Sequence, residues 1–198
     1  MGLDLEDVSG QTPLDEDEKD GLKLTSITTR ADLDQFEQLN IEKAVEWSLK
    51  RKFPRNLILD EPFVRELHKR MYGEVWKWAG EFRRTDKNIG VDKLQIGIEL
   101  RKLIDDAAYW IDNRTFQPDD IAVRFSHRIV SIHCFSNGSG RHSRLIADIL
   151  ASHALDRPVF TWGSVSLTDA GEARAHYLAA IREADQGNID PLIEFARG

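Results

Sequence analysis

Apolar side chains recur every three or four residues along most of the chain, which is the spacing of amphipathic helices. The pattern predicts a mainly α-helical protein. Helices are expected over residues 31–49, 61–72, 94–113 and 118–132, after residue 140 up to a turn at 156–158, from Ser166 or Thr168 to 186, and from 190 onward. Residues 159–162 are expected to be a short strand or an extended segment. No repeat or shift in composition divides residues 21–198, so we expect a single domain there.

The first long helix is expected to follow an N-cap at Thr29 and to turn its apolar residues toward the core. These residues are Leu33, Phe36, Ile41, Ala44, Val45 and Leu49.

The most informative stretch, residues 133–144, joins the end of one predicted helix to the start of the next. Gly138 and Gly140 allow positive φ angles, so backbone N–H groups can turn inward at the positive end of the following helix and bind an anion such as phosphate. Arg141 and Arg144 are three residues apart and share a helix face, so they can bind one polyanion. His133 can accept a proton at neutral pH. The alternative is a helix–turn–helix corner with a glycine cap and solvated arginines.

The order of residues in this stretch resembles the signature of the Fic family, H-x-F-x-(Asp/Glu)-G-N-G-R-x-x-R. The matching residues are His133, Phe135, Gly138, Gly140, Arg141 and Arg144. The resemblance implies a Fic-type helical bundle with a small β-hairpin flap over the active site. It also implies a nucleotidyltransferase, which moves AMP or another nucleoside monophosphate from a triphosphate such as ATP to a Ser, Thr or Tyr hydroxyl of a target protein.

The same resemblance assigns a role to each residue of the stretch. His133 would deprotonate the target hydroxyl, and Phe135 would anchor the loop in the core. The phosphates would be bound by Asn137, Gly138, Ser139, Gly140, Arg141 and Arg144. Asn137 would also be a weak ligand of Mg²⁺ that is bound to the phosphates.

Two positions depart from the signature. Asn137 stands where an acidic magnesium ligand is usual, and because an amide oxygen carries no charge, the affinity for Mg²⁺ should fall. Ser139 replaces an asparagine of the loop. These changes leave two alternatives open: a weak or silent Fic fold that binds nucleotide or protein, and a phosphotransferase. His133 argues against a silent module, which needs no base.

Residues 84–91 are expected to form the flap, because residues 78–83 resemble the family's entry into it. The flap would bind the target by strand addition through Lys87, Asn88, Ile89 and Gly90. The alternative is an ordinary exposed hairpin.

Many Fic proteins are held inactive by a glutamate on an inhibitory helix. Glu37 lies on the first long helix, but Leu33 and Gln38 depart from the motif that surrounds the inhibitory glutamate. If Glu37 is inhibitory, we expect it to pair with Arg144. The alternative is a solvated helical glutamate.

A finer resemblance is to the mobile mystery protein B subfamily, and it rests on residues 27–31, 40–41, 87–91 and 141–145. Members of this group are encoded beside a small helix-turn-helix protein. The resemblance therefore implies such a partner and a toxin–antitoxin-like pair in a bacterium.

Charge is uneven along the chain, which has a net charge of −7. The first twenty residues hold eight acids and one base, whereas residues 21–198 hold 26 residues of each sign. We expect residues 1–20 to be a mobile acidic tail, or else a docking strip for a basic partner. Because no basic tract is present, we expect no direct binding of nucleic acid.

Cys134 is the only cysteine, so no internal disulfide can form. The N-terminus lacks the basic residues of a signal peptide, and no apolar run approaches the roughly 20 residues of a membrane helix. These features predict a cytoplasmic protein without membrane association. The sequence leaves the target protein, the nucleotide and a homo-oligomeric state open.

Overall fold

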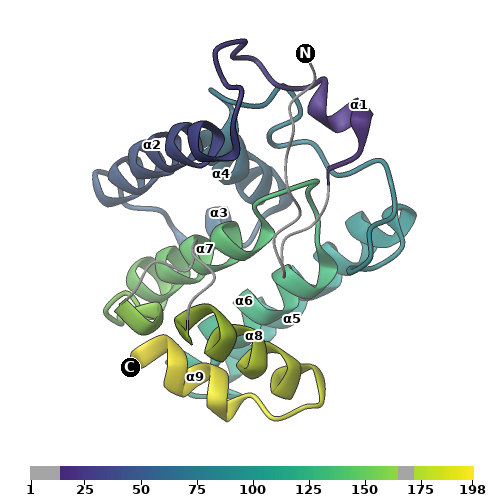
Figure 1. The fold of residues 1–198 in the computed structure, drawn as a ribbon. Helices are drawn as coiled ribbons and strands as arrows, with labels where there is room; N and C mark the ends of the chain where they lie inside the picture. Colours follow the sequence, from purple (N-terminus) through teal and green to yellow (C-terminus); the bar gives the residue numbers. More distant parts are fainter. Residues whose placement is uncertain (1–13, 165–171) are drawn as a thin grey trace.

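A computed structural model of the chain describes residues 14–164 and 172–198 (Figure 1). The regular elements in these ranges are helices: α1 (Glu16–Lys19), α2 (Arg30–Leu49), α3 (Arg55–Ile58), α4 (Glu61–Tyr72), η1 (Lys93–Gln95), α5 (Ile96–Asn113), α6 (Pro118–Ile132), α7 (Ser139–Ala154), η2 (Trp162–Ser164), α8 (Glu172–Asp185) and α9 (Asp190–Arg197). The mainly α-helical prediction is confirmed. The predicted caps at Ser166 and Thr168 lie outside the described residues.

The helices α6 and α7 form the centre of the molecule, and the short loop between them carries residues 133–138. One hydrophobic core joins α7 to α4, α5 and α6, and it is built from side chains such as Leu67, Leu100, Phe125 and Ile146. A smaller core packs α8 and α9 against α6 and α7 (Figure 1). The loop therefore has packed helices on both sides, which fix its ends.

Helix α2 is present as predicted, with Thr29 accepting a hydrogen bond from the backbone N–H of Asp32, but its buried face differs from the prediction. The buried residues are Leu33, Glu37, Asn40, Ala44 and Ser48. Phe36 and Val45, which we expected in the core, are 37% and 36% exposed. The physical reason is that this face must satisfy polar groups of the segment it packs against.

Asn40 is the clearest example of such a polar contact. Its side chain donates to the carbonyl of Arg70 at 2.8 Å and accepts from the backbone N–H of Glu74 at 2.9 Å, just beyond the end of α4. The last carbonyls of a helix have no partner within it, so a buried amide is well suited to this position.

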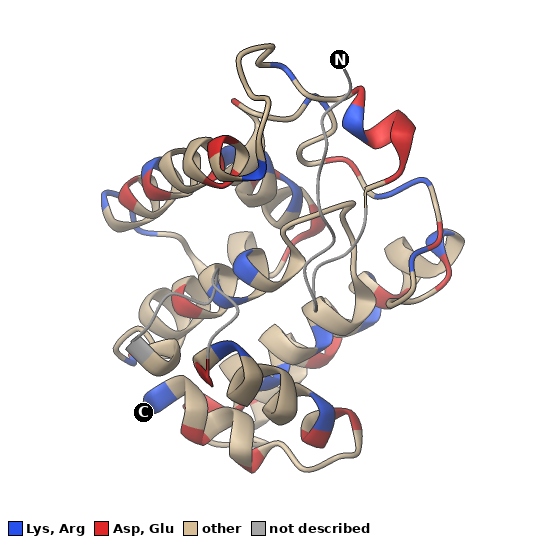
Figure 2. Ribbon diagram, viewed as in Figure 1, with Lys and Arg blue, Asp and Glu red and all other residues tan. Residues whose placement is uncertain are grey.

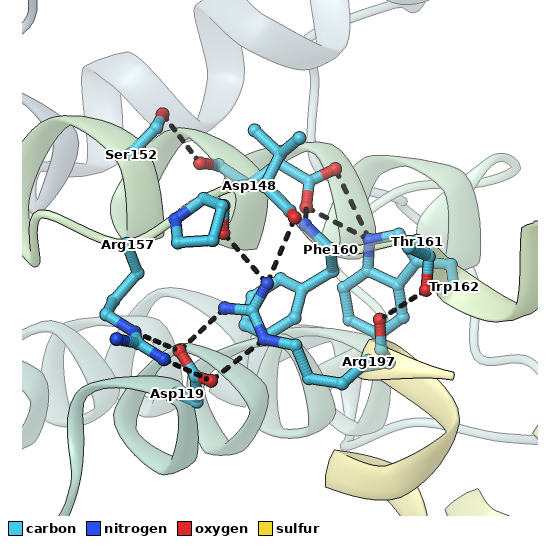
Figure 3. A network of polar contacts seen from close by, with 11 residues as sticks. Asp119, Asp148, Ser152, Arg157, Phe160, Thr161, Trp162 and Arg197 are labelled. Atoms are coloured by element: carbon cyan, nitrogen blue, oxygen red, sulfur yellow. Dashed lines mark hydrogen bonds and ion pairs between the residues drawn. The ribbon is translucent and has the colours of Figure 1, made fainter.

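A polar network fixes the C-terminal helix to the centre of the fold (Figure 3). Asp119 on α6 accepts from Arg197 at 2.6 and 2.8 Å and from Arg157 at 3.0 and 3.3 Å. Asp148 on α7 accepts from the backbone N–H of Phe160 at 3.0 Å and from the indole of Trp162 at 3.1 Å. The strand predicted as one possibility for residues 159–162 does not form, because residues 157–161 have no regular structure and Trp162 begins η2.

The described part of the acidic segment, residues 14–20, contains helix α1, and the mobility expected of residues 1–20 stays a prediction. Figure 2 shows α1 as mainly acidic, and it lies beside residues 75–78. The indole of Trp78 donates to the carbonyl of Glu18 at 2.9 Å, and the backbone N–H of Lys77 donates to the carbonyl of Gly21 at 2.8 Å. None of the helices in the described ranges is both long and apolar enough to cross a membrane.

Candidate active site

His133 closes α6 in the left-handed conformation, with φ of 55°. A non-glycine residue seldom adopts this conformation, which turns the chain sharply from α6 into the loop. The imidazole is only 3% exposed, yet it borders a cavity of the described region. Burial, with the nearby charges of Arg83 and Lys87, lowers the pKa of His133 to about 4. The ring is therefore neutral at pH 7 and can accept a proton.

The loop after His133 is held by residues of α4 that the sequence did not single out. Phe135 is buried as predicted and stacks on the ring of His68, with ring centroids 3.8 Å apart. The Nδ1 atom of His68 accepts from the backbone N–H of Gly80 at 3.0 Å, so its Nε2 donates to the carbonyl of Asn137 at 3.0 Å. His68 therefore ties the loop both to α4 and to the segment that leads to the flap.

The two loop glycines differ in conformation. Gly138 has φ of 78°, as predicted, and a Cβ atom there would overlap the phenol ring of Tyr72. We expected Gly140 to be left-handed as well. It is helical instead, because it lies in the first turn of α7. A Cβ atom on Gly140 would meet no atom of the described chain within 4 Å. Gly140 therefore keeps space open at the cavity rather than shaping the turn.

The N-terminus of α7 faces the cavity, which Gly138, Ser139, Gly140 and Arg141 all border. The first N–H groups of a helix have no acceptor within it, and they carry partial positive charge. The side-chain hydroxyl of Ser139 is buried and has no hydrogen-bond partner within the described ranges. Together, these groups can donate hydrogen bonds to a phosphate oxygen.

Both polar groups of the Asn137 side chain form hydrogen bonds with the protein. Its side-chain oxygen accepts from the backbone N–H of Gly138 at 2.7 Å, and its NH₂ group donates to Glu37 at 3.3 Å. Among the residues that the structure describes, no group of three His, Cys, Asp or Glu side chains could hold a metal. This donor set does not fit a magnesium ion held by the protein, so we derive no step through one.

Glu37 lies in the site, and the prediction that it would pair with Arg144 is wrong. Its carboxylate, only 1% exposed, accepts from Arg141 at 2.5 Å and from the indole of Trp76 at 2.7 Å. It is therefore not the solvated glutamate of the alternative reading. The guanidinium of Arg144 instead lies 5.1 Å from the ring centroid of Tyr177 on α8.

The segment expected to be a β-hairpin flap, residues 84–91, has no strand, so the hairpin prediction is wrong. It is an irregular strap held by Arg83, whose buried guanidinium donates to the carbonyls of His133 at 2.7 Å, of Thr85 at 2.9 Å and of Val91. Side-chain donors thus replace the cross-strand hydrogen bonds of a hairpin. No motif or periodic pattern in the sequence indicates this role of Arg83.

Of the four predicted flap residues, Gly90 and Ile89 border the cavity. A Cβ atom on Gly90 would lie 2.7 Å from the Cβ of His133, so only glycine lets the strap approach this residue so closely. Asn88 is exposed. Lys87 has a side chain only 4% exposed, and it bonds to Asp15 at 2.9 Å and to Glu18 at 2.6 Å next to α1.

The cavity beside His133 has a volume of about 430 Å³ and brings together helices from both ends of the chain. Its lining combines the predicted residues His133, Asn137, Gly138, Ser139, Gly140, Arg141 and Arg144. Arg30 and Asp34 on α2 and Arg174 on α8 also border it, and the sequence did not single them out.

Residues 58–151 match the profile of the Fic/DOC family. These residues belong to the Fic/DOC family. The Fic domain runs from the end of α3 to α7 and so contains His133, the loop and both motif arginines. The inhibitory candidate Glu37, as well as Arg30 and Arg174, lie outside the matched residues.

The chain is similar in sequence to the "Protein adenylyltransferase Fic" of Drosophila grimshawi and of Aedes aegypti. Each is 29% identical over 136 residues, which is 67% of this chain and 26% of the relative. The chain therefore spans about a quarter of the length of these curated relatives.

Solved structures share the fold. The N-terminal Fic domain of a Bartonella effector protein, from Bartonella sp. AR 15-3, has a TM-score of 0.67 and 15% identity, covering 86% of this chain and 83% of that one. The N-terminal Fic domain of a cell filamentation protein from Bartonella quintana, solved with bound ADP, has a TM-score of 0.64 and 15% identity, covering 87% and 86%. At this identity the likeness establishes a Fic-type helical fold alone. The finer resemblance to the mobile mystery protein B subfamily stays a prediction.

Proposed function

We propose that the protein transfers a nucleoside monophosphate, with AMP from ATP as the first candidate, to a hydroxyl side chain of a target protein. The observation that carries the proposal is that His133, the N-terminus of α7 and Arg144 border one cavity. A proton acceptor, anion donors and a cation are the groups that phosphoryl chemistry needs. The similarity to relatives named adenylyltransferase and the ADP in a structural relative support the choice of nucleotide.

In the proposed reaction, a ring nitrogen of His133 takes the proton of the target hydroxyl, and the hydroxyl oxygen bonds to the α-phosphorus. The bond from this phosphorus to the oxygen that bridges to the β-phosphorus breaks, and pyrophosphate leaves. Backbone N–H groups of α7 and the Ser139 hydroxyl donate to phosphate oxygens, while Arg144 balances the charge on the leaving group.

The strap of residues 84–91 is the proposed binding place for the target backbone. Ile89 and Gly90 border the cavity beside His133, and Ile89 is 50% exposed, which supports this assignment. A target segment bound there would bring its hydroxyl to the neutral imidazole.

The test is incubation of the protein with a lysate and with ATP labelled either on the α-phosphate or on the γ-phosphate. We expect transfer of the α-label only, and a loss of roughly 100-fold or more in His133→Ala. The matched control is His176→Ala, an exposed histidine on α8 that does not border the cavity. Transfer of the γ-label would identify a phosphotransferase. Label transfer that is unchanged in His133→Ala would remove the proposal.

The second candidate is a Fic fold that binds nucleotide without transfer. The contact between Glu37 and Arg141 favours it, because a carboxylate at 2.5 Å competes with phosphate for this guanidinium. The departures at Asn137 and Ser139 favour it as well. Saturable ATP binding without modified protein, in both wild type and Glu37→Gln, would select this candidate.

A further inference from the structure

Two arginines outside the signature border the same cavity as the two within it. Arg30 is the first residue of α2, and Arg174 lies near the start of α8. With Arg141 and Arg144 they place four guanidinium groups from three helices around one space. The first turns of α7 and α8 both carry basic residues in Figure 2. Such a concentration of like charge is unfavourable unless carboxylates or a bound anion balance it.

The carboxylates near these arginines are unevenly distributed. Asp34 pairs with Arg30 at 3.2 Å, and Glu37 pairs with Arg141 at 2.5 Å. Arg144 has no ion pair within the described ranges, and its guanidinium lies 5.1 Å from the ring centroid of Tyr177. Arg174 precedes Tyr177 by three residues on α8, so the two side chains share a helix face. Arg144 therefore lies over the face of α8 from which Arg174 projects.

Different charged groups lie near the two ends of the cavity. Burial and then the charges of Arg144, Arg30 and Arg141 lower the pKa of Arg174, whereas the charges that act on His133 are those of Arg83 and Lys87. The contacts agree, because His133 lies against Gly90 of the strap whereas Arg144 lies over Tyr177 on α8, so the imidazole and the arginine cluster border different parts of the space. A ligand that reaches both must be extended and must carry its negative charge at one end.

We propose that Arg174, together with Arg144, binds the terminal phosphate of a nucleoside triphosphate. This inference rests on the proposed function, because it takes the α-phosphate to lie at His133. The chain of phosphates then extends past the N-terminus of α7, and its last group, which carries the most negative charge, reaches Arg144 and Arg174. Arg30 adds charge at the same end. Arg174 thereby selects triphosphates over monophosphates, a role that lies outside the matched family residues 58–151.

Binding of ATP, ADP, AMP and inorganic tripolyphosphate, measured by calorimetry, tests this assignment. Wild type, Arg174→Ala and the matched control Arg182→Ala, an exposed arginine on the same helix, are compared. We expect Arg174→Ala to weaken ATP and tripolyphosphate binding by about tenfold and AMP binding by less than about twofold, because the lost contact is one charge-assisted interaction. Arg174→Lys should recover part of the loss, and Arg182→Ala should lose nothing. The series is repeated with Glu37→Gln, in which the competing carboxylate is gone.

Other outcomes separate the two proposals. Equal losses for ATP and AMP in Arg174→Ala, or no loss at all, would overturn the role of Arg174 whether or not transfer occurs. Binding of ATP with the expected selectivity but without transfer would keep the subsite and reject the transferase. If neither nucleotide nor tripolyphosphate binds in either background, the subsite is rejected as well. Thermal melts of each variant exclude loss of folding as the cause.

Discussion

At the scale of single residues, the site depends on two glycines with opposite properties. Gly138 is left-handed and packed against Tyr72, whereas Gly140 is helical and open to the cavity. The first shapes the loop, and the second leaves room for a ligand. Their substitution by alanine should therefore separate folding from binding.

We expect Gly138→Ala to destabilise the protein by about 3 kcal/mol, because it adds a left-handed alanine and a clash with a buried ring. Gly140→Ala should leave stability unchanged or raise it by up to ~1 kcal/mol, since alanine favours a helix. ATP affinity should nevertheless fall in Gly140→Ala, because the methyl group enters the space next to the N-terminus of α7. Chemical denaturation and calorimetry measure the two effects. A destabilised Gly140→Ala, or one that binds ATP normally, contradicts this assignment.

From the lowered pKa of His133 we expect an unusual pH dependence of activity. Because its pKa is lowered to about 4, the imidazole stays neutral through the physiological range. Transfer should thus be level between roughly pH 6 and 8 as far as this base is concerned, and should fall only as the pH approaches about 4. Initial rates in matched buffers test this. Half-maximal activity near the ordinary histidine value of about 6.5 would mean that burial does not govern the base.

Histidine burial also affects stability. The unfolded chain binds protons below about pH 6.5, whereas native His133 and His142 bind them only near pH 4. Their contribution to stability is therefore complete above the unfolded pKa and is lost as the pH falls from about 6.5 toward 4.

The proposed catalytic and phosphate-binding residues could be predicted because they lie within one short stretch of the sequence. His133, Gly138 and the two motif arginines follow one another closely in sequence, and the loop requires these residue types. His68 and Arg83 escaped prediction because their roles come from contacts far along the chain, 69 and 50 residues away. A buried histidine or arginine has no periodic signature in the sequence.

At the scale of elements, α2 shows where apolar periodicity fails. Of the apolar residues that predicted the helix, Leu33 and Ala44 are buried, but Phe36 and Val45 are exposed. The buried face carries Glu37 and Asn40 as well. These polar side chains satisfy Trp76, Arg141 and the end of α4, so the helix is oriented by hydrogen bonds as well as by burial. The hairpin prediction was wrong for a similar reason. Arg83 supplies hydrogen-bond donors that a hairpin would take from a partner strand.

The pairing of Glu37 with Arg141 predicts that α2 restrains the site. Glu37→Gln keeps an oxygen for the Trp76 indole but removes the charge that competes with phosphate. We expect a stability loss of about 2 kcal/mol, because a mostly buried arginine loses its partner, together with an increase in ATP affinity or self-modification of about tenfold. Glu42→Gln, an exposed glutamate on the same helix, should change neither. Unchanged nucleotide binding in Glu37→Gln would show that the contact is structural only.

At the scale of the whole molecule, the network around Asp119 joins α6, the segment 157–161 and α9 (Figure 3). Hydrogen bonds from Arg197 and Arg157 lower the pKa of Asp119 to about 2. Since the folded-state pKa is depressed, the stabilisation is present above the unfolded value of 3.8 and is lost as the pH falls toward about 2.

We expect Asp119→Asn to cost about 1–2 kcal/mol at pH 7, after allowing for screening of a partly exposed group. Asp106→Asn, an exposed aspartate on α5, is the matched control and should cost less than about 0.5 kcal/mol. The difference between the two variants should shrink as the pH is lowered below 3.8. Urea denaturation at several pH values measures this. A difference that does not depend on pH would mean that packing, rather than charge, holds the C-terminal helix.

The single cysteine has a practical consequence. Cys134 is 1% exposed, and burial raises the pKa of its thiol to about 12, so it should not react with maleimides in the native protein. New thiols at the exposed positions Asp17 and Asn88 would then take up spin labels selectively, without removal of the native cysteine. The spacing between these labels would report whether the acidic helix leaves the strap when nucleotide enters.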